Sequence, residues 1–172
     1  MPSFNAARHG LRSVLRSGVA LAGLLILTTA CRYAPADTAA ERNKMLVRQM
    51  LQEMDSAPWT DITTKWMTPD YRLVLNGSAM DLAGYREISA GTTAAFSNLK
   101  HDIHHIVAEG DRVAVALTFR ATHTGPYEGI AATGRTIAIE EIVVLQFRDD
   151  KVVNEWAVVD LAAVGHQLRK EG

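Results

Sequence analysis

The stretch Arg112–His123, RVAVALTFRATH, gives the clearest structural signal in the sequence. Successive side chains of a β-strand point to opposite faces, so alternation of apolar and other residues predicts a strand with one buried face. The apolar face of this predicted strand carries Val113, Val115, Leu117 and Phe119. The other face, with Ala114, Ala116 and Thr118, is mild enough to pack against a second copy of the chain, so a homodimer is compatible with the sequence.

Runs rich in Val, Ile and Phe surround this stretch and predict further strands. They span Leu99–Ala108, Thr136–Arg148 and Val152–Val159. The short connections Glu109-Gly110-Asp111 and Asp149-Asp150 are typical of tight turns, which join antiparallel neighbours. We therefore expect an antiparallel sheet in the second half of the chain.

Helical spacing of apolar residues dominates the first half of the domain. Helices are predicted over Glu41–Asp55, Trp59–Met67 and Asp81–Phe96, with a short strand at Tyr71–Leu75 and a last helix at Leu161–Arg169. Helices followed by antiparallel strands indicate an α+β fold, in which the helices cover one side of a curved sheet.

The N-terminal region has a different composition. Residues 1–30 contain Arg8, Arg12 and Arg16 but no acidic residue, and end in the apolar run Gly18–Ala30. A basic start followed by a short apolar run is typical of a secretory signal and is too short for a spanning helix. We expect residues 1–30 to be a signal peptide, 31–40 a tether, 41–168 one domain and 169–172 a tail.

Cys31, the only cysteine, stands directly after the apolar run. The segment Leu27–Cys31 resembles a bacterial lipobox, which predicts lipidation of Cys31 and a membrane-anchored lipoprotein of the cell envelope. Ordinary cleavage after Ala34-Pro35-Ala36 is the alternative and predicts a secreted protein. A single cysteine also excludes an internal disulfide and a cysteine-rich zinc site.

The net charge gives no sign of a nucleic-acid partner. The chain has 18 basic and 19 acidic side chains, and removal of residues 1–30 leaves 15 basic and all 19 acidic ones, a net charge of −4. Nucleic-acid-binding domains normally present a basic face. The exported domain is therefore expected to be mildly acidic.

The cluster His101-Asp102-Ile103-His104-His105 is the densest group of ionisable residues. In a strand His101 and His105 share one face but lie about 13 Å apart, too far for one metal ion. We therefore expect no metal site there, but a solvated strand end or part of an interface.

Asp160 and His123 are the stronger candidates for residues that transfer protons. Asp160 follows a predicted strand and precedes a predicted helix, so it fits a helix N-cap or, beside Trp156, a partly desolvated acid/base group. His123 shares the face of Phe119, where it is either a hydrogen-bonded buried histidine or a proton-transfer group.

The pair Glu140-Glu141 lies inside a predicted strand. Strand alternation requires one of the two carboxylates to face apolar residues or a cavity, and the sequence does not decide which. The chain contains no phosphate-binding loop, no dinucleotide-binding glycine pattern and no nucleophile elbow.

An ordered series of short segments resembles the SnoaL-like polyketide cyclases, also called ester cyclases. The segments are Ile106–Val113, Thr122–Gly125, Thr133–Arg135, Asn154–Trp156 with Asp160, and Gln167-Leu168. The resemblance covers about residues 41–168. It implies the nuclear transport factor 2-like fold, a cone of curved sheet wrapped by helices around an apolar pocket.

The resemblance also implies an activity, namely ring closure by intramolecular aldol condensation of a small hydrophobic carbonyl compound, without metal or organic cofactor. Asp160 would be the acid/base, and His123 would line or polarise the pocket. We expect the rings of Trp59, Trp66 and Trp156 to form apolar wall, an inference from their size. The alternative function is an exported binding module that uses the same pocket without catalysis.

Overall fold

The computed structural model describes residues 38–56 and 58–169. The predicted signal peptide, Cys31 and the first part of the tether lie outside these residues, as do residues 170–172. Among the described helices, none has the length and apolar character needed to cross a bilayer.

Six strands form one mixed sheet in the order β2-β1-β6-β5-β4-β3. The strands are β1 (Met67–Leu75), β2 (Ser78–Asp81), β3 (Phe96–Glu109), β4 (Arg112–His123), β5 (Thr136–Arg148) and β6 (Lys151–Val159). The four long strands agree closely with the predicted runs, and the α+β fold class is confirmed. The short edge strand β2 was not predicted.

One strand pair differs from the antiparallel expectation. β3, β4, β5 and β6 pair antiparallel, with tight turns between β3 and β4 and between β5 and β6 and a longer connection, residues 124–135, between β4 and β5. In contrast, β1 runs parallel to β6, with Val74 opposite Trp156. Parallel neighbours cannot be joined by a tight turn, so this pair links segments about 80 residues apart. Local patterns carry no information about such a pairing.

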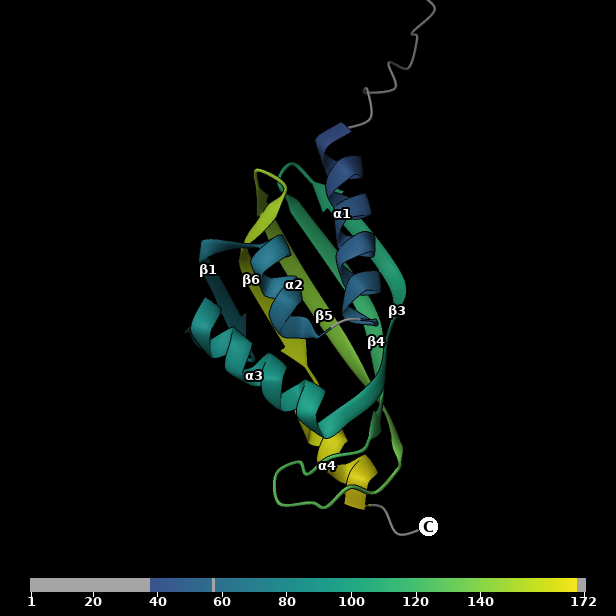
Figure 1. Cartoon of the computed structure of the whole chain (residues 1–172). Coiled ribbons are helices and arrows are strands. Elements are labelled where there is room, and N and C mark those ends of the chain that lie inside the picture. The colour runs from purple at the N-terminus through teal and green to yellow at the C-terminus, as the bar shows by residue number, and fades with distance from the viewer. Residues whose placement is uncertain (1–37, 57, 170–172) are drawn as a thin grey trace, which may run out of the picture. The chain divides into compact units, whose positions relative to one another are not determined.

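Four helices accompany the sheet, and α1, α2 and α3 cover one of its faces (Figure 1). Their bounds are α1 (Thr38–Met54), α2 (Trp59–Trp66), α3 (Leu82–Ala95) and α4 (Leu161–Arg169). Asp81 caps α3 by accepting a hydrogen bond from the amide of Gly84 at 3.1 Å. Helix α1 packs on β3 and β4, and α4 packs on β5.

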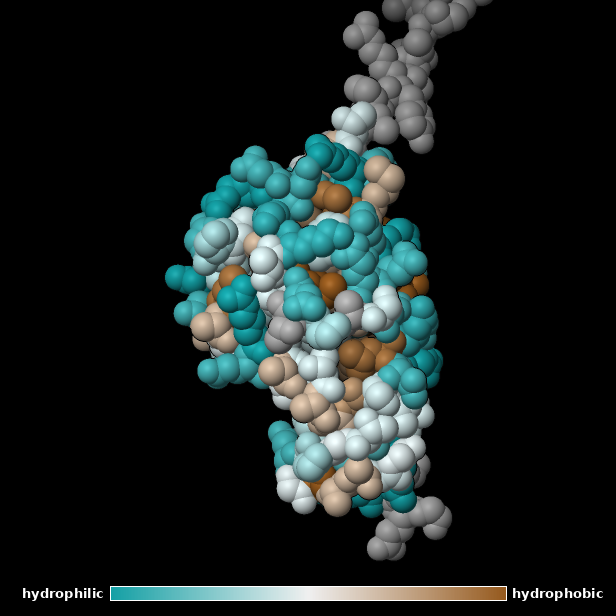
Figure 2. Space-filling model, in the orientation of Figure 1, coloured by the Kyte–Doolittle hydropathy of each residue, from teal (hydrophilic) through white to brown (hydrophobic). Residues whose placement is uncertain are grey.

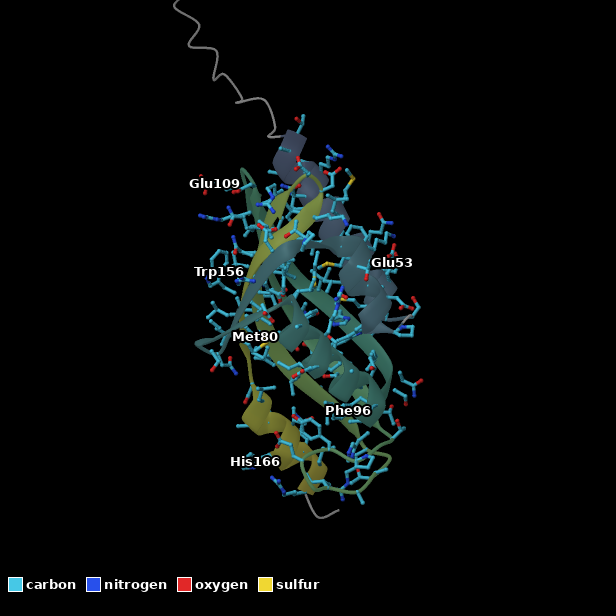
Figure 3. The ribbon with its side chains drawn as sticks, turned by 60° about the vertical axis from the view of Figure 1, so that its left-hand side comes forward. Glu53, Met80, Phe96, Glu109, Trp156 and His166 are labelled. Carbon is cyan, nitrogen blue, oxygen red and sulfur yellow. The ribbon has the colours of Figure 1, made fainter. Side chains whose placement is uncertain are left out.

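The two faces of the sheet differ strongly in exposure. The helix-covered face, here called the inner face, buries the alternating apolar residues of β4 that the sequence predicted. The opposite or outer face exposes Ile142, Trp156 and Val158 by 57%, 41% and 66%. Figure 3 shows Trp156 on the side of the sheet away from Glu53 on α1. From the helix side the surface is mainly hydrophilic, with apolar patches between the helices (Figure 2).

Candidate functional site

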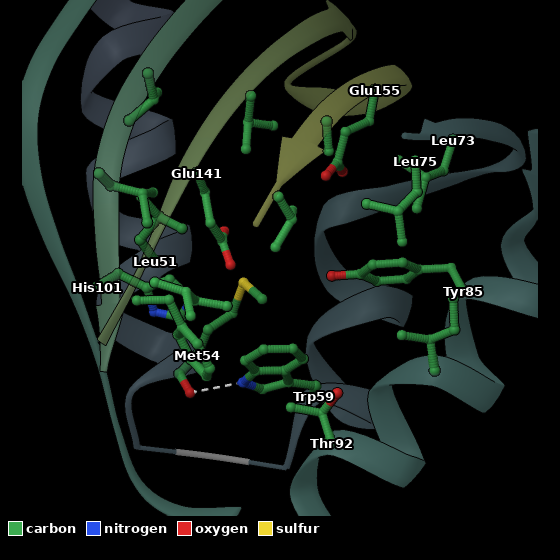
Figure 4. A pocket seen from close by; sticks show the side chains of 18 of the residues that line it. Leu51, Met54, Trp59, Leu73, Leu75, Tyr85, Thr92, His101, Glu141 and Glu155 are labelled. Carbon is green, nitrogen blue, oxygen red and sulfur yellow. Dashed lines mark hydrogen bonds between the residues drawn. The ribbon is translucent and has the colours of Figure 1, made fainter. Parts of the chain in front are cut away.

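A cavity of about 160 Å³ lies between the helices and the inner face of the sheet. Its walls are mainly apolar and come from α1, α2, α3, α4 and the long strands (Figure 4). The central wall residues are Met50, Leu51, Met54, Trp59, Leu117 and Phe119. A dry apolar cavity of about 150 Å³ can hold a benzene-sized molecule, so a small apolar compound fits here.

Two carboxyl groups, Glu141 of β5 and Glu155 of β6, line this otherwise apolar space. Glu155 lies opposite Leu145 in the β5–β6 register, and Glu141 lies opposite Val159. Both therefore project from the inner face, about 13 Å apart along the strands. Figure 4 shows the two side chains reaching into the same space.

The surroundings shift both carboxyl groups toward neutral pH. Burial raises the pKa of Glu155 to about 7, against a smaller opposing effect of the hydrogen bond from Tyr71. Burial also raises the pKa of Glu141 to about 7, and the charge on Glu155 adds to this shift. An ionised Glu155 therefore opposes ionisation of Glu141, since like charges in one cavity repel.

Two tyrosines accompany the carboxyl pair. The hydroxyl of Tyr71 donates a hydrogen bond of 2.6 Å to Oε2 of Glu155, and its ring packs on Tyr85 at 5.5 Å between centroids. The side chain of Tyr85 points into the cavity (Figure 4). Burial and the nearby carboxylates raise the pKa of Tyr85, which keeps its hydroxyl a proton donor.

At another part of the wall, His101 of β3 lines the cavity and pairs with Asp55, which follows α1. Oδ1 of Asp55 lies 2.7 Å from Nδ1 of His101 and accepts a hydrogen bond from its backbone amide. The prediction of a solvated strand end is therefore wrong for His101, whose side chain is 4% exposed.

The three tryptophans predicted to line the pocket lie in three different places in the structure. Trp59 lines the cavity, and its Nε1 donates to the carbonyl of Met54 at 2.9 Å. Trp66 is buried but outside the cavity, with Nε1 donating to Glu53 at 2.8 Å. Trp156 lies on the outer face, so the pocket placement of Trp66 and Trp156 is corrected.

Asp160 also lies outside the cavity. It is exposed and begins α4, where its Oδ1 accepts a hydrogen bond from the amide of Ala163 at 3.1 Å. Asp160 does share a face of the sheet with Trp156 and Val158, as predicted. That face is the outer one, away from the cavity. The structure thus gives Asp160 the geometry of a helix cap and corrects the expected placement beside a pocket.

His123 is completely buried at the end of β4, yet it does not line the cavity. Its Nδ1 lies 3.0 Å from the hydroxyl of Thr133, and its ring packs on Phe96 at 5.3 Å. The backbone amide and carbonyl of His123 bond to Arg135 and Gly134. His123 therefore holds the Thr133–Arg135 segment, in place of the pocket-lining role expected from the resemblance.

The neighbouring Gly125 explains a second part of the same motif. Its amide donates to the carbonyl of Ala95 at 2.9 Å, and a Cβ there would lie 2.2 Å from the carbonyl oxygen of Ala94. Only glycine permits so close an approach of two backbones. The Thr122–Gly125 motif thus secures the end of α3 against the sheet.

Sequence reasoning missed Glu155, Asp55 and the cavity position of His101. A signal existed for Glu141, because alternation required one of Glu140 and Glu141 to face a cavity. Tyr71 and Glu155 meet through the long-range pairing of β1 with β6, which no local pattern indicates. Over residues 38–56 and 58–169, no three or more His, Cys, Asp or Glu side chains group as a metal ion requires.

Comparison with known protein families gives one match that spans nearly the whole described domain. Residues 45–168 match the family described as SnoaL-like polyketide cyclase. Sequences of curated proteins contain no significant match to the chain.

Solved structures give close matches in fold. AclR from Streptomyces galilaeus, for which a hydroxylase role has been suggested, is 28% identical with a TM-score of 0.70, over 75% of this chain and 82% of that one. A suggested polyketide cyclase from Acidithiobacillus ferrooxidans is 26% identical with a TM-score of 0.63, over 74% and 94%. A suggested SnoaL-like cyclase from Jannaschia sp. CCS1, 20% identical with a TM-score of 0.69 over 78% and 96%, shares the fold.

Proposed function

The chain belongs to the SnoaL-like polyketide cyclase family, and from this premise we propose that its cavity catalyses proton transfer on a small, largely apolar carbonyl compound. The chemistry is of the cofactor-free aldol type, with Glu141 as the acid/base group. The names of the similar structures favour a cyclase or hydroxylase type of activity.

The observation that carries the proposal is a carboxyl group with a pKa of about 7 inside an apolar cavity. A general acid/base works best when its pKa lies near the operating pH. An exposed glutamate is almost fully ionised at neutral pH and is a weak base, whereas Glu141 exchanges protons readily there. Perturbed carboxyl groups in a cavity are a frequent mark of catalytic sites.

The residues around Glu141 fit removal of a proton from carbon. The carboxylate of Glu141 takes a proton from the carbon next to a carbonyl group, and the C–H electron pair moves into an enolate. The hydroxyl of Tyr85, held neutral by its raised pKa, is placed to donate a hydrogen bond to the enolate oxygen. The apolar walls exclude water, which strengthens that hydrogen bond.

Glu155 controls the charge of the site. When Glu155 is ionised its charge favours the protonated form of Glu141, and when Glu155 is neutral Glu141 ionises more easily. The hydrogen bond from Tyr71 stabilises the ionised form of Glu155. The pair therefore stores and releases one proton near neutral pH, as interacting carboxyl groups do.

The proposal can be tested by hydrogen–deuterium exchange of 2-indanone, a small apolar ketone, in D2O at pH 7. Proton NMR follows loss of the signals of the carbons next to the carbonyl group. We expect the native chain to accelerate exchange and Glu141→Gln to lower the rate by about 100-fold. Glu140→Gln, one residue away on the outer face, is the matched control and should stay within about twofold.

Each result bears on the choice between catalysis and binding. If the native chain gives only the buffer rate of exchange while 2-indanone still quenches its tryptophan fluorescence, catalysis is overturned and the exported binding module remains. Equal rates in the native chain and Glu141→Gln overturn the role of Glu141. Asp160→Asn extends the test, because exchange lost only in that variant returns the acid/base role to Asp160.

We further propose, from the sequence alone, that the domain is exported and anchored through lipid on Cys31. The support is the basic start, the apolar run and the cysteine that follows it directly. Mass spectrometry of membrane-extracted protein should show a diacylglycerol adduct that is absent from Cys31→Ser. A soluble native protein cut near Ala36 overturns the anchor and supports plain secretion.

A further inference from the structure

His101 occupies a special place in the cavity wall. It lies on β3 opposite Phe119, which in turn lies opposite Ile139, two residues before Glu141 on β5. From standard strand spacings, its Cα lies about 12 Å from that of Glu141. Both side chains line the same cavity, so a small molecule bound there can lie between them.

Asp55 fixes the orientation of the His101 ring. Its Oδ1 contacts both Nδ1 and the backbone amide of His101, while its Oδ2 accepts a hydrogen bond from Lys100 at 3.0 Å. Partial burial pushes the pKa of Asp55 upward, but the bonds from His101 and Lys100 outweigh it and hold the pKa below its usual value. An ionised Asp55 accepts the Nδ1 proton, so proton exchange falls to Nε2 on the other side of the ring.

Two aromatic rings also pack against the ring of His101 and help to fix its position. The centroid of His101 lies 5.1 Å from Phe119 and 5.8 Å from Trp59. Trp59 is itself fixed by the bond from its Nε1 to Met54 (Figure 4). A histidine oriented by a carboxylate and placed in an apolar cavity has the arrangement of a general acid/base.

A hydrogen-bonded chain on the outer face of the sheet offers a contrast. His104 lies three residues later, and its Nε2 is 2.6 Å from the hydroxyl of Thr118, which donates to Glu140 at 2.7 Å. This chain stays on the outer face, where the Nε2 of His104 is already engaged. The Nε2 of His101 faces away from Asp55, and the ring lines the cavity.

We propose that His101, oriented by Asp55, is a second proton-transfer group of the cavity, which acts at the second carbonyl of the substrate in the aldol ring closure that the family resemblance implies. This inference rests on the proposed function of Glu141. The apolar wall between the two groups suits the carbon chain, and each polar end of the substrate meets one of them.

The reaction balances as an isomerisation. Glu141 takes a proton from the carbon next to the first carbonyl, and the enolate carbon forms a C–C bond to the second carbonyl carbon. The π electrons of that second C=O bond move to its oxygen, which takes a proton from Nε2 of protonated His101. The product is a cyclic β-hydroxy ketone. After its release Glu141 gives its proton to solvent and His101 takes one from solvent, which restores both groups.

Heptane-2,6-dione is a probe that separates the two proton transfers. In D2O, proton NMR measures exchange next to the carbonyls, and carbon NMR measures closure to 3-hydroxy-3-methylcyclohexanone. His101→Asn keeps an amide near the Nδ1 position to bond Asp55 but lacks Nε2. We expect it to retain exchange within about threefold and to lose closure by about 100-fold.

Two further variants keep the test decisive. His104→Asn, the same change on the outer face, should leave both rates unchanged within about twofold. Asp55→Asn serves if His101→Asn fails to fold; it keeps an acceptor for the backbone amide of His101 but removes the charge, and closure should fall about tenfold or more.

The outcomes separate this inference from the proposed function. Absence of exchange in the native chain overturns both. Exchange and closure that persist together in His101→Asn and Asp55→Asn overturn the role of His101 alone. An equal loss of both rates in either folded variant shows that His101 only shapes the cavity, and also overturns the inference.

Discussion

The two faces of strands β5 and β6 differ in their surroundings: the outer face is exposed to solvent, and the inner face lines the cavity. Glu140 on the outer face is exposed and accepts a hydrogen bond from Thr118, whereas Glu141 on the inner face has a pKa of about 7 in an apolar cavity. On β6, Glu155 points inward and Trp156 outward. A one-residue step along a strand therefore separates a solvated carboxyl group from one buried in the cavity.

The largest expected effect concerns pH and stability. Glu141 has a raised pKa in the folded chain, so the stability it contributes is present below pH 4.5 and is lost as the pH rises through about 7. Glu141→Gln removes the cost of ionisation, so its free energy of unfolding at pH 8 should exceed that of the native chain by about 3 kcal/mol. At pH 4 the two should agree. Urea denaturation at both pH values measures this.

Glu140→Gln is the control for the same experiment. Because water reaches this carboxylate, the change should shift unfolding by the same small amount at both pH values. A native chain equally stable at pH 4 and pH 8 relative to Glu141→Gln contradicts the raised pKa.

A second prediction concerns the volume of the cavity. Ala157 lines the cavity, whereas the next residue, Val158, is 66% exposed on the outer face. Ala157→Leu fills the cavity and should weaken binding of 2-indanone about tenfold, or about 1.4 kcal/mol. Val158→Leu should leave binding unchanged. Titration of Trp59 fluorescence measures both, and equal affinities in both variants would place the ligand elsewhere.

A third prediction compares two hydroxyl donors to glutamate. Tyr71→Phe leaves Glu155 without its hydrogen bond inside the cavity and should lower the free energy of unfolding by about 1–2 kcal/mol. Thr118→Val removes the bonds of this hydroxyl to Glu140 and to His104; both of these partners are exposed and can bond to water instead, so the change should cost less than about 1 kcal/mol. Thermal unfolding of both variants at pH 7 tests the order, and a larger cost for Thr118→Val contradicts it.

The smallest effect is expected at the turn that joins the two strands. Asp149 and Asp150 both have positive φ, 52° and 63°, a conformation that suits glycine better. Asp150 also pairs with Arg42, but exposed ion pairs contribute little. Asp150→Gly should raise the free energy of unfolding by about 0.5 kcal/mol without changing 2-indanone exchange. A loss of stability would show that the Arg42 pair outweighs the backbone strain.

The sequence predicted the elements well because their signals are local. The alternation of β4 and the helical spacing of α1 and α4 need only neighbouring residues, and those elements lie where predicted. The parallel pairing of β1 with β6 depends on residues far apart in sequence, and it was not predicted.

The candidate site was harder to predict for the same reason. Asp160 and His123 attracted attention because they stand in recognisable motifs, yet the structure gives them a cap and a loop contact. Glu155, Glu141 and His101 lie in stretches that the sequence did single out, but strand alternation alone could not place their side chains in one cavity. Strand alternation placed Trp156 and Asp160 on the same face of the sheet, but it could not predict which face the helices cover.

Glu141 and Glu155 share one apolar cavity, and burial there raises the pKa of each to about 7. Carbon NMR titration of the glutamate carboxyl groups in the native chain measures both values. Two resonances should titrate near pH 7, one should vanish in each of Glu141→Gln and Glu155→Gln, and the resonance of Glu141 should move to lower pH in Glu155→Gln. Titration of every glutamate near pH 4.5 would show that the cavity does not raise these pKa values.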